Sequence, residues 1–346
     1  MADYKKLTVS ECAERILEAK SPLVVMHVRP DGDTVGAAAA LMHIFHRLGK
    51  APVFACSDPI PERLEFLIAD FREAYRHELD SSTVITVDVP TREQIGEIYD
   101  YLPPVSLMID HHMIGAPFED NLIISNASSA GEIVMQIAEE LERMGKIKLD
   151  ARIAEPIYAA ISSDTGCFRY SNATPETLRR GASLIELGAD SAEINHKLFN
   201  SKTPRQIKAE GFVAEHIETE FGGRIAYAVV TRRDRKNLDV LMEHFETAID
   251  VVRSVAMVEI AFVIKETDNG EFKASLRTNL YNVAEIAASF GGGGHIKAAG
   301  CTIPARRIRD AKEMMIKTIK NTYYKSVPYD AELRLAESVA KSASAG

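Results

Sequence analysis

The chain has 346 residues, of which 46% are apolar and 26% are charged, and these values suit two globular domains of roughly 150 residues each. This composition excludes a disordered chain, and no apolar run approaches the roughly 18 residues that a membrane span needs. The formal net charge of −9 excludes a protein that coats long nucleic acid, because such proteins neutralise phosphates with a basic surface.

The first 20 residues are polar and contain no apolar core of the kind found in secretory signals, so we expect a cytoplasmic protein without membrane association. Four scattered cysteines form no C-x-x-C pair, which favours ordinary buried thiols in a reducing compartment. Residues 200–346 carry a slight excess of Lys and Arg, so the net negative charge lies in the first 199 residues. This asymmetry is typical of an acidic, metal-collecting half followed by a half that receives a small anion.

Short apolar runs alternate with amphipathic helical patterns through the first half of the chain. This alternation predicts β-α-β units, in which parallel strands form a sheet flanked by helices. The expected strands span residues 23–28, 52–55, 83–87 and 105–109. The expected helices span residues 33–48, 92–101, 131–145, 152–162 and 175–187. We therefore expect residues 1–190 to form an α/β domain with a mainly parallel sheet.

A polar stretch at residues 191–206 separates this region from a second set of elements and is expected to be the linker. Beyond it, strands are expected at residues 225–231, 255–265 and 271–277. The Gly222-Gly223 and Asn269-Gly270 pairs supply turns. We expect a smaller α/β domain over residues 207–330 and a C-terminal tail over residues 331–346.

The strongest motif contains the first expected strand and the residues after it, in the run L-V-V-M-H-V-R-P-D-G-D-T-V-G at residues 23–36. It places His27, Asp31 and Asp33 at the carboxyl end of a strand, where open α/β sheets bind ligands. Two carboxylates beside an imidazole repel each other unless a cation neutralises them. Alternatively, Asp31 and Gly32 form a turn and Asp33 caps the helix, and this motif alone favours neither interpretation.

Three further segments place acids or imidazoles at element ends. Asp88 follows the strand at residues 83–87, and Asp164 follows the helix at residues 152–162. The strand at residues 105–109 ends in Asp110-His111-His112. Taken singly, Asp88 fits a turn residue before Pro90, and Asp164 fits a helix terminus. Taken together they favour one site, because successive parallel strands end at the same edge of a sheet.

Histidine and carboxylate ligands without thiolates favour Mn²⁺, Mg²⁺, Fe²⁺ or Co²⁺ over structural Zn²⁺. Five or six protein ligands exceed the needs of one tetrahedral ion, so we expect two divalent cations about 3.5 to 4 Å apart. Such a pair can activate a hydroxide for attack on phosphorus. The sequence therefore predicts phosphoester hydrolysis.

A glycine run occurs late in the chain, in F-G-G-G-G-H-I-K-A-A-G at residues 290–300. Four glycines without side chains let backbone N–H groups face a phosphate, and a helix beginning near His295 would add its positive N-terminus. His295 and Lys297 could supply further donors. The alternative is a flexible turn for the glycines.

In their order along the chain, these motifs resemble the four motifs of the DHH phosphoesterase superfamily. The residues that carry this resemblance are His27, Asp31, Asp33, Asp88, Asp110, His111, His112 and Asp164. The run G-G-G-G-H-x-x-A-A-G and the preceding K-A-S-L-R at residues 273–277 resemble the DHHA1 domain, which binds substrate in one DHH subfamily. The resemblance extends from about residue 23 to residue 303.

The resemblance implies a role for each residue. The metal ligands would be His27, Asp31, Asp33, Asp88, His111 and Asp164. Among these, His27 and Asp31 would bind the first ion, Asp88 would bridge both ions, and the other three would bind the second. Of the catalytic residues Asp88, Asp110 and His112, Asp110 would support the histidines and His112 would face the substrate phosphate. The substrate-binding residues would be Arg277, Gly291, Gly292, Gly293, Gly294 and His295. Arg277 would bind a phosphate with two hydrogen bonds, although taken alone it also fits a solvated strand charge.

The resemblance further implies an enzyme that hydrolyses short RNA or dinucleotides to mononucleotides, using hydroxide activated by two metals, most suitably Mn²⁺. Stand-alone enzymes of this kind include nanoRNases and phosphatases of 3′-phosphoadenosine 5′-phosphate. Two alternatives stay open at this point: a phosphodiesterase of cyclic dinucleotides, and a non-catalytic nucleotide sensor. An exposed edge of either domain could support a homodimer.

Overall fold

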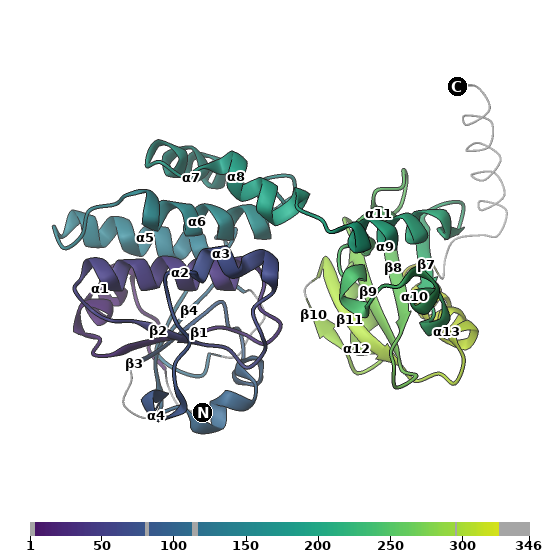
Figure 1. The fold of residues 1–346 in the computed structure, drawn as a ribbon, viewed down its shortest axis with the longest axis horizontal. Coiled ribbons are helices and arrows are strands. Elements are labelled where there is room, and N and C mark those ends of the chain that lie inside the picture. Colours follow the sequence, from purple (N-terminus) through teal and green to yellow (C-terminus); the bar gives the residue numbers. More distant parts are fainter. Residues whose placement is uncertain (1–3, 80–82, 113–116, 295, 325–346) are drawn as a thin grey trace. The chain divides into compact units, whose positions relative to one another are not determined.

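The computed structural model describes residues 4–79, 83–112, 117–294 and 296–324, and the chain forms two compact units, Met1–Ser201 and Lys202–Gly346 (Figure 1). Each unit has its own sheet and its own hydrophobic core. The expected C-terminal tail lies outside the described residues. None of the described helices is both long enough and apolar enough to cross a membrane.

The N-terminal unit contains a five-stranded sheet in the order β2-β1-β3-β4-β5, and every neighbouring pair is parallel. This arrangement confirms the predicted α/β class. The strands are β1 (Pro22–Val25), β2 (Val53–Ala55), β3 (Thr83–Val87), β4 (Val105–Asp110) and β5 (Asn121–Ile123). The sequence patterns did not predict β5, because three residues are too short for a recognisable alternation.

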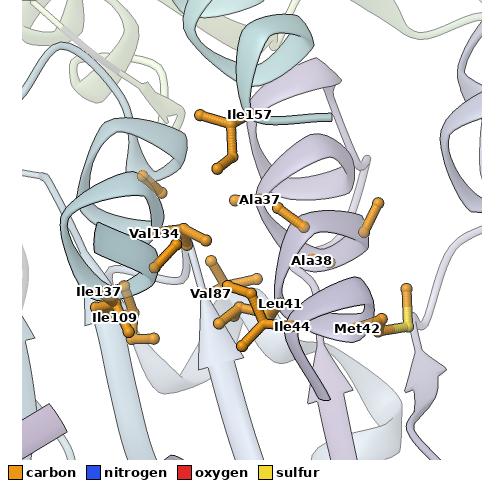
Figure 2. Packing of buried hydrophobic residues seen from close by; sticks show 14 of the residues in the cluster. Ala37, Ala38, Leu41, Met42, Ile44, Val87, Ile109, Val134, Ile137 and Ile157 are labelled. Carbon is orange, nitrogen blue, oxygen red and sulfur yellow. The ribbon is translucent and has the colours of Figure 1, made fainter. Parts of the chain in front are cut away.

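Helices cover one face of this sheet and form the larger core of the unit. They are α1 (Val9–Glu18), α2 (Gly32–Arg47), α5 (Ala130–Arg143) and α6 (Ala151–Asp164), with α7 (Pro175–Glu186) packed against α6. Figure 2 shows Leu41 and Ile44 of α2 beside Val87 of β3, and Ile109 of β4 beside Ile137 of α5. The short elements η1 (Glu62–Leu64) and α3 (Glu65–Ile68) join this core beside α2. The other face of the sheet packs against α4 (Arg76–Leu79) and the segment at residues 89–102.

Helix α2 begins directly after the first motif, and its sequence explains both its start and its close packing. The Asp31 side chain accepts hydrogen bonds from the N–H groups of Asp33 and Thr34 and so caps the helix. A run of four buried alanines, residues 37–40, keeps the helix surface narrow. A Cβ atom at Gly36 would lie 2.6 Å from the Pro156 carbonyl oxygen of α6, so only glycine permits this approach. The Asp31 cap therefore sets where α2 begins, and the small residues of the helix allow the close approach to α6.

The predicted helix at residues 92–101 is wrong as a single element. The chain forms two short 3₁₀ helices, η2 (Arg92–Ile95) and η3 (Glu97–Tyr101), which meet at Gly96. Gly96 has a φ of 78°, which interrupts a right-handed helix. A Cβ atom there would lie 2.5 Å from the Val28 side chain and 2.6 Å from Ser57 Oγ. Contact with the loop after β1 therefore overrides the helical pattern.

The stretch at residues 191–206 contains more structure than its polar composition indicates. It includes α8 (Ser191–Asn195), the π-helix η4 (His196–Asn200) and the beginning of α9 (Pro204–Glu215). The division between the two compact units follows Ser201. Thr203 caps α9 with a capping box that includes Gln206.

The C-terminal unit contains a six-stranded sheet in the order β10-β11-β9-β8-β7-β6, in which β7 and β8 are parallel and the other pairs are antiparallel. The strands are β6 (Glu218–Glu220), β7 (Ile225–Val230), β8 (Ile260–Glu266), β9 (Phe272–Thr278), β10 (Gly293–Gly294) and β11 (Ala298–Ile303). One face packs against α12 (Val283–Ala288) and α13 (Ile308–Tyr323). On the other face, α9, η5 (Met242–Phe245) and α11 (Ala248–Arg253) cover β7 and β8, and α10 (Arg232–Leu238) follows β7.

Two expectations for this unit are wrong. The predicted strand at residues 255–265 begins only at Ile260, because α11 and its C-terminal turn occupy the preceding residues. The predicted helix near His295 does not form, since Ala298–Ile303 is strand β11 and pairs with both β9 and β10. The alternate residues Ala299, Cys301 and Ile303 are buried, so the period is that of a strand. His295 itself lies outside the described residues.

Candidate metal centre

Acidic and imidazole side chains gather where the strands of the N-terminal sheet end. His27 follows β1, Asp88 follows β3, and His111 follows β4. Asp31 and Asp33 begin α2, whose N-terminus meets the same edge, and Asp164 is the last residue of α6. The structure thus brings the six expected ligands together, although the segments that carry them span residues 27–164.

One group consists of His27, Asp31 and Asp88, whose potential ligand atoms lie within 4.8 Å of one another. His27 Nε2 lies 3.7 Å from Asp31 Oδ1 and 3.4 Å from Asp88 Oδ2. The other ring nitrogen of His27, Nδ1, lies 2.7 Å from the Val28 carbonyl oxygen. A carbonyl only accepts, so Nδ1 carries the proton and the lone pair of neutral His27 lies on Nε2, toward the carboxylates.

A second group consists of Asp33, His111 and Asp164, also within 4.8 Å of one another. His111 Nε2 lies 3.6 Å from Asp33 Oδ2 and 3.8 Å from Asp164 Oδ2. It also lies 3.5 Å from Asp88 Oδ1. The two oxygens of Asp88 therefore face different histidines, and Asp88 is the residue that connects the two groups.

Asp88 combines a strained backbone conformation with a buried side chain. Its φ is 60°, a conformation that costs a non-glycine residue on the order of 1 to 3 kcal/mol. Its N–H donates to the Ile109 carbonyl oxygen at 2.9 Å, which fixes this conformation against β4. Asp88 is 3% exposed, and within the described residues nothing donates a hydrogen bond to its Oδ1. A buried carboxylate oxygen without a donor fits a bound cation.

Asp33 is held by the first turn of α5. Its two oxygens accept hydrogen bonds from the N–H groups of Ala130 at 2.7 Å and Gly131 at 2.9 Å. Burial and the charges of Asp88 and Asp164 nevertheless raise the pKa of Asp33 well above its usual value. Burial likewise raises the pKa of Asp164 to about 7, although His111 opposes this shift. Burial and mutual repulsion therefore disfavour the ionised forms of these carboxylates, and bound cations would stabilise those forms.

His112 differs from the other two histidines because a buried carboxylate holds it. Its Nδ1 lies 2.7 Å from Asp110 Oδ1, and Asp110 is 1% exposed. Burial lowers the pKa of His112, but the Asp110 hydrogen bond and the charge of Asp88 outweigh it and raise the pKa to about 9. Near neutral pH His112 is therefore a cation beside the acidic groups, suited to contact with a phosphate oxygen.

Asn172 belongs to this site and was missed by the sequence analysis. Its Nδ2 donates to the carbonyl oxygens of Ser128 at 3.1 Å and Asp164 at 3.2 Å, and lies 3.5 Å from Asp164 Oδ2. It therefore connects the end of α6 to the loop before α5. Its only sequence cue is its position eight residues after Asp164, and an asparagine in a polar loop is too common to be informative.

The expected substrate residues lie in the C-terminal unit. Arg277 projects from β9, is partly buried, and donates from Nη1 to the Leu276 carbonyl oxygen at 3.0 Å. The glycine run follows α12 and continues into β10. A Cβ atom at Gly292 would lie 2.3 Å from the Gly300 carbonyl oxygen, whereas one at Gly293 would meet nothing within 4 Å. Packing thus requires glycine at residue 292 but not at residue 293.

Comparison with known proteins agrees with both units. Residues 22–161 match the DHH family, N-terminal domain, and residues 222–321 match the DHHA1 domain. The chain is 28% identical to the bifunctional oligoribonuclease and PAP phosphatase NrnA of Mycoplasma genitalium, over 91% of this chain and 99% of that protein. It is 26% identical to NrnA of Thermus thermophilus, over 89% of this chain and 92% of that protein.

Solved structures share this fold. An exopolyphosphatase-related protein from Bacteroides fragilis superimposes with a TM-score of 0.83 at 22% identity, covering 90% of this chain and 96% of that one. RecJ of Thermus thermophilus, solved with Mn²⁺, superimposes with a TM-score of 0.53 at 13% identity, covering 90% of this chain and 55% of that one. At these identities the likeness establishes the fold alone.

Proposed function

The chain belongs to the DHH family and combines its N-terminal domain with a DHHA1 domain, and from this premise we propose a metal-dependent oligoribonuclease and 3′-phosphoadenosine 5′-phosphate phosphatase. The observation that carries the proposal is Asp88, whose two carboxylate oxygens face two separate groups of ligands. A carboxylate in this position is suited to bridging two cations. The relatives named as oligoribonuclease and PAP phosphatase match nearly their whole length and so support this substrate class.

In this proposal each cation has its own ligands. His27 and Asp31 would hold one, with Asp88 completing the group. Asp33, His111 and Asp164 would hold the other, with Asp88 contributing to it as well. Imidazole and carboxylate ligands without thiolate suit Mn²⁺ best among the common divalent ions, with Mg²⁺, Fe²⁺ and Co²⁺ as substitutes.

The bound cations would polarise the phosphoryl oxygens and lower the pKa of the attacking water. The chain supplies the remaining parts. Protonated His112, held by Asp110, offers an N–H to a phosphate oxygen and stabilises the charge that develops during displacement. Gly131 orients the Asp33 carboxylate and Asn172 holds the Asp164 main chain, so these residues are positioned before substrate binds.

Substrate recognition is assigned to the C-terminal unit. The Arg277 guanidinium can donate two parallel hydrogen bonds to one phosphate, and the backbone of residues 291–294 can contribute further donors. Both proposed substrate classes offer such a phosphate in addition to the one that is hydrolysed. His295 would extend this set of donors.

The test is hydrolysis of an adenylate dinucleotide and of 3′-phosphoadenosine 5′-phosphate, with Mn²⁺ and after chelation of metal. We expect mononucleotide release only with metal, and a loss of at least about 100-fold in kcat/KM for Asp88→Asn. Asp100→Asn, which removes an exposed carboxylate outside the site, is the matched control and should retain activity. Tight dinucleotide binding without cleavage in every metal would instead identify a nucleotide sensor.

A further inference from the structure

The segment at residues 127–131 leads into the first turn of α5 and contacts the second group of ligands, Asp33, His111 and Asp164. The first two N–H groups of α5 donate to the Asp33 carboxylate. The Ala127 carbonyl oxygen lies 3.4 Å from His111 Nδ1. Because a carbonyl only accepts, this contact places a proton on Nδ1 and leaves the lone pair of the neutral ring on Nε2, toward the carboxylates.

The third ligand, Asp164, is tied to the same segment through Asn172. The Asn172 amide donates both to the Ser128 carbonyl oxygen and to the Asp164 carbonyl oxygen. Among the hydrogen bonds of the described residues, none joins His27 or Asp31 of the first group to this segment. The segment therefore supports one group of ligands and not the other.

Glu132, in the first turn of α5, holds this segment in place. Its Oε2 accepts hydrogen bonds from the Ser128 N–H at 3.1 Å and from Ser128 Oγ at 2.6 Å. The same oxygen accepts from Thr177 Oγ1 of α7 at 3.2 Å. The Glu132 N–H donates to Oγ of Ser129, the residue that caps α5, at 3.1 Å. Glu132 therefore fixes both serines, one through its side chain and one through its main chain.

Burial makes the Glu132 carboxylate depend on a nearby cation. Glu132 is only 5% exposed, and its second oxygen, Oε1, lies 3.6 Å from Nε of Arg180 in α7. The Arg180 side chain is partly buried, and its Nε has no hydrogen-bond partner among the described residues. Buried ion pairs often stabilise a fold no more than apolar residues of the same volume, so stability alone does not account for this pair.

We propose that Glu132, neutralised by Arg180, is a positioning residue for the cation of the second group. Glu132 acts through the segment at residues 127–131, whose N–H and C=O groups orient the ligands. The inference rests on the two-cation site of the proposed function and gives one of its two cations a separate support. Loss of such a support lowers metal affinity by about 10 to 100-fold, so the two cations should respond differently to loss of Glu132.

The test measures Mn²⁺ binding by calorimetry in two backgrounds that each retain one cation. Asp31→Asn weakens the first group and keeps the cap of α2, because asparagine caps a helix as well as aspartate does. Asp164→Asn weakens the second group instead. Glu132→Ala should lower Mn²⁺ affinity about 10 to 100-fold in the Asp31→Asn background and leave it unchanged in the Asp164→Asn background.

Two milder variants grade the effect. Glu132→Gln keeps an acceptor for Ser128 and Thr177 and should lose less affinity than Glu132→Ala. Ser128→Ala removes only the 2.6 Å hydrogen bond, so it tests the same contact even if Glu132→Ala does not fold. It should lower the affinity of the same cation by a smaller factor.

The matched control is Glu139→Ala. Glu139 also belongs to α5 and also pairs with Arg180, at 3.1 Å, but it is exposed and lies two turns further along the helix. Its replacement should leave Mn²⁺ affinity unchanged in both backgrounds. A loss in the control as large as that in Glu132→Ala would overturn the assignment to Glu132.

Thermal unfolding in chelator separates positioning from stability, and none of these measurements requires hydrolysis. A selective loss in the Asp31→Asn background supports the inference even if the protein cleaves no RNA. Equal losses in both backgrounds, or lower stability with unaltered Mn²⁺ affinity, would overturn it and leave the proposed function standing. A wild-type protein that binds fewer than two Mn²⁺ ions would overturn the two-cation site of the proposed function, and the inference with it.

Discussion

The Gly131 N–H donates a hydrogen bond to Asp33 Oδ1 at 2.9 Å and thereby joins the first turn of α5 to the first turn of α2. The contact depends on close helix packing, since a Cβ atom at Gly131 would lie 2.4 Å from the Ala160 Cβ of α6. The orientation of a proposed metal ligand is thus determined by a contact among three helices.

Gly131→Ala should force α5 and α6 apart and displace Asp33. We expect a loss of stability of about 1 to 3 kcal/mol from overpacking, together with weaker metal binding. Thermal unfolding and calorimetric titration with Mn²⁺ would measure the two effects. Gly211→Ala in α9 is the control, because a Cβ atom there meets nothing within 4 Å and should leave both quantities unchanged or slightly raise stability. Unaltered metal affinity in Gly131→Ala would contradict the positioning role.

In the metal-free protein, the contribution of Asp33 to stability should fall as pH rises above about 4. The pKa of Asp33 is raised in the folded state, so the folded protein holds this proton more tightly than the unfolded chain. That contribution is present below the unfolded pKa and is lost as pH rises toward the folded pKa. Denaturant unfolding in chelator should therefore give a smaller decline with pH for Asp33→Asn than for the wild type. Parallel pH curves for the two proteins would exclude this linkage.

Metal binding should release protons at neutral pH. Attraction to Asp31 and Asp88 overcomes burial and raises the pKa of His27 to about 11, so the metal-free site holds this imidazole as a cation. A histidine must lose its proton to bind a metal. Mn²⁺ titrations in buffers of different ionisation enthalpy should thus show net proton release, and apparent affinity should rise with pH. Binding heats that are independent of the buffer would contradict a histidine ligand at this position.

Asp110→Asn should affect turnover more than metal affinity. The Asp110 carboxylate keeps the pKa of His112 at about 9, and the amide removes this charge while keeping the side-chain size. We expect the alkaline limb of the kcat profile to shift to lower pH and kcat at pH 8 to fall by about 10 to 100-fold. In a His112→Gln background the same substitution should have little further effect. Additive losses in the double variant would show that Asp110 acts by another route.

Asn172→Ala should weaken metal binding without unfolding the N-terminal unit. The side chain ties the Asp164 backbone to the Ser128 carbonyl group, and removing such a support costs about 10 to 100-fold in metal affinity. The measurement is Mn²⁺ affinity beside thermal unfolding in chelator. Asn200→Ala, outside the site, provides the comparison. A fall in stability with unaltered Mn²⁺ affinity would assign Asn172 a structural role only.

The amino-acid sequence by itself determined the α/β class and the strands that carry His27, Asp88 and His111. Parallel strands have a strong apolar pattern, and their carboxyl ends share one edge, so acids and imidazoles after successive strands can be placed together before any coordinates exist. The helix at residues 92–101 and the helix near His295 were predicted wrongly. A loop contact at Gly96 and the pairing of β11 with its neighbours decided these segments, and neither is visible in a local pattern.

Only the tertiary structure decided how the side chains meet. The positive φ of Asp88 and the division of its oxygens between two histidines depend on pairing between β3 and β4. Asn172 supports Asp164 because the loop after α6 folds back toward the end of that helix. Lys265 and Lys273 face each other because β8 and β9 pair in one register, and a shift of one residue would turn the lysines to opposite faces. Cross-strand register arises from packing of the whole sheet, so no single segment of sequence contains it.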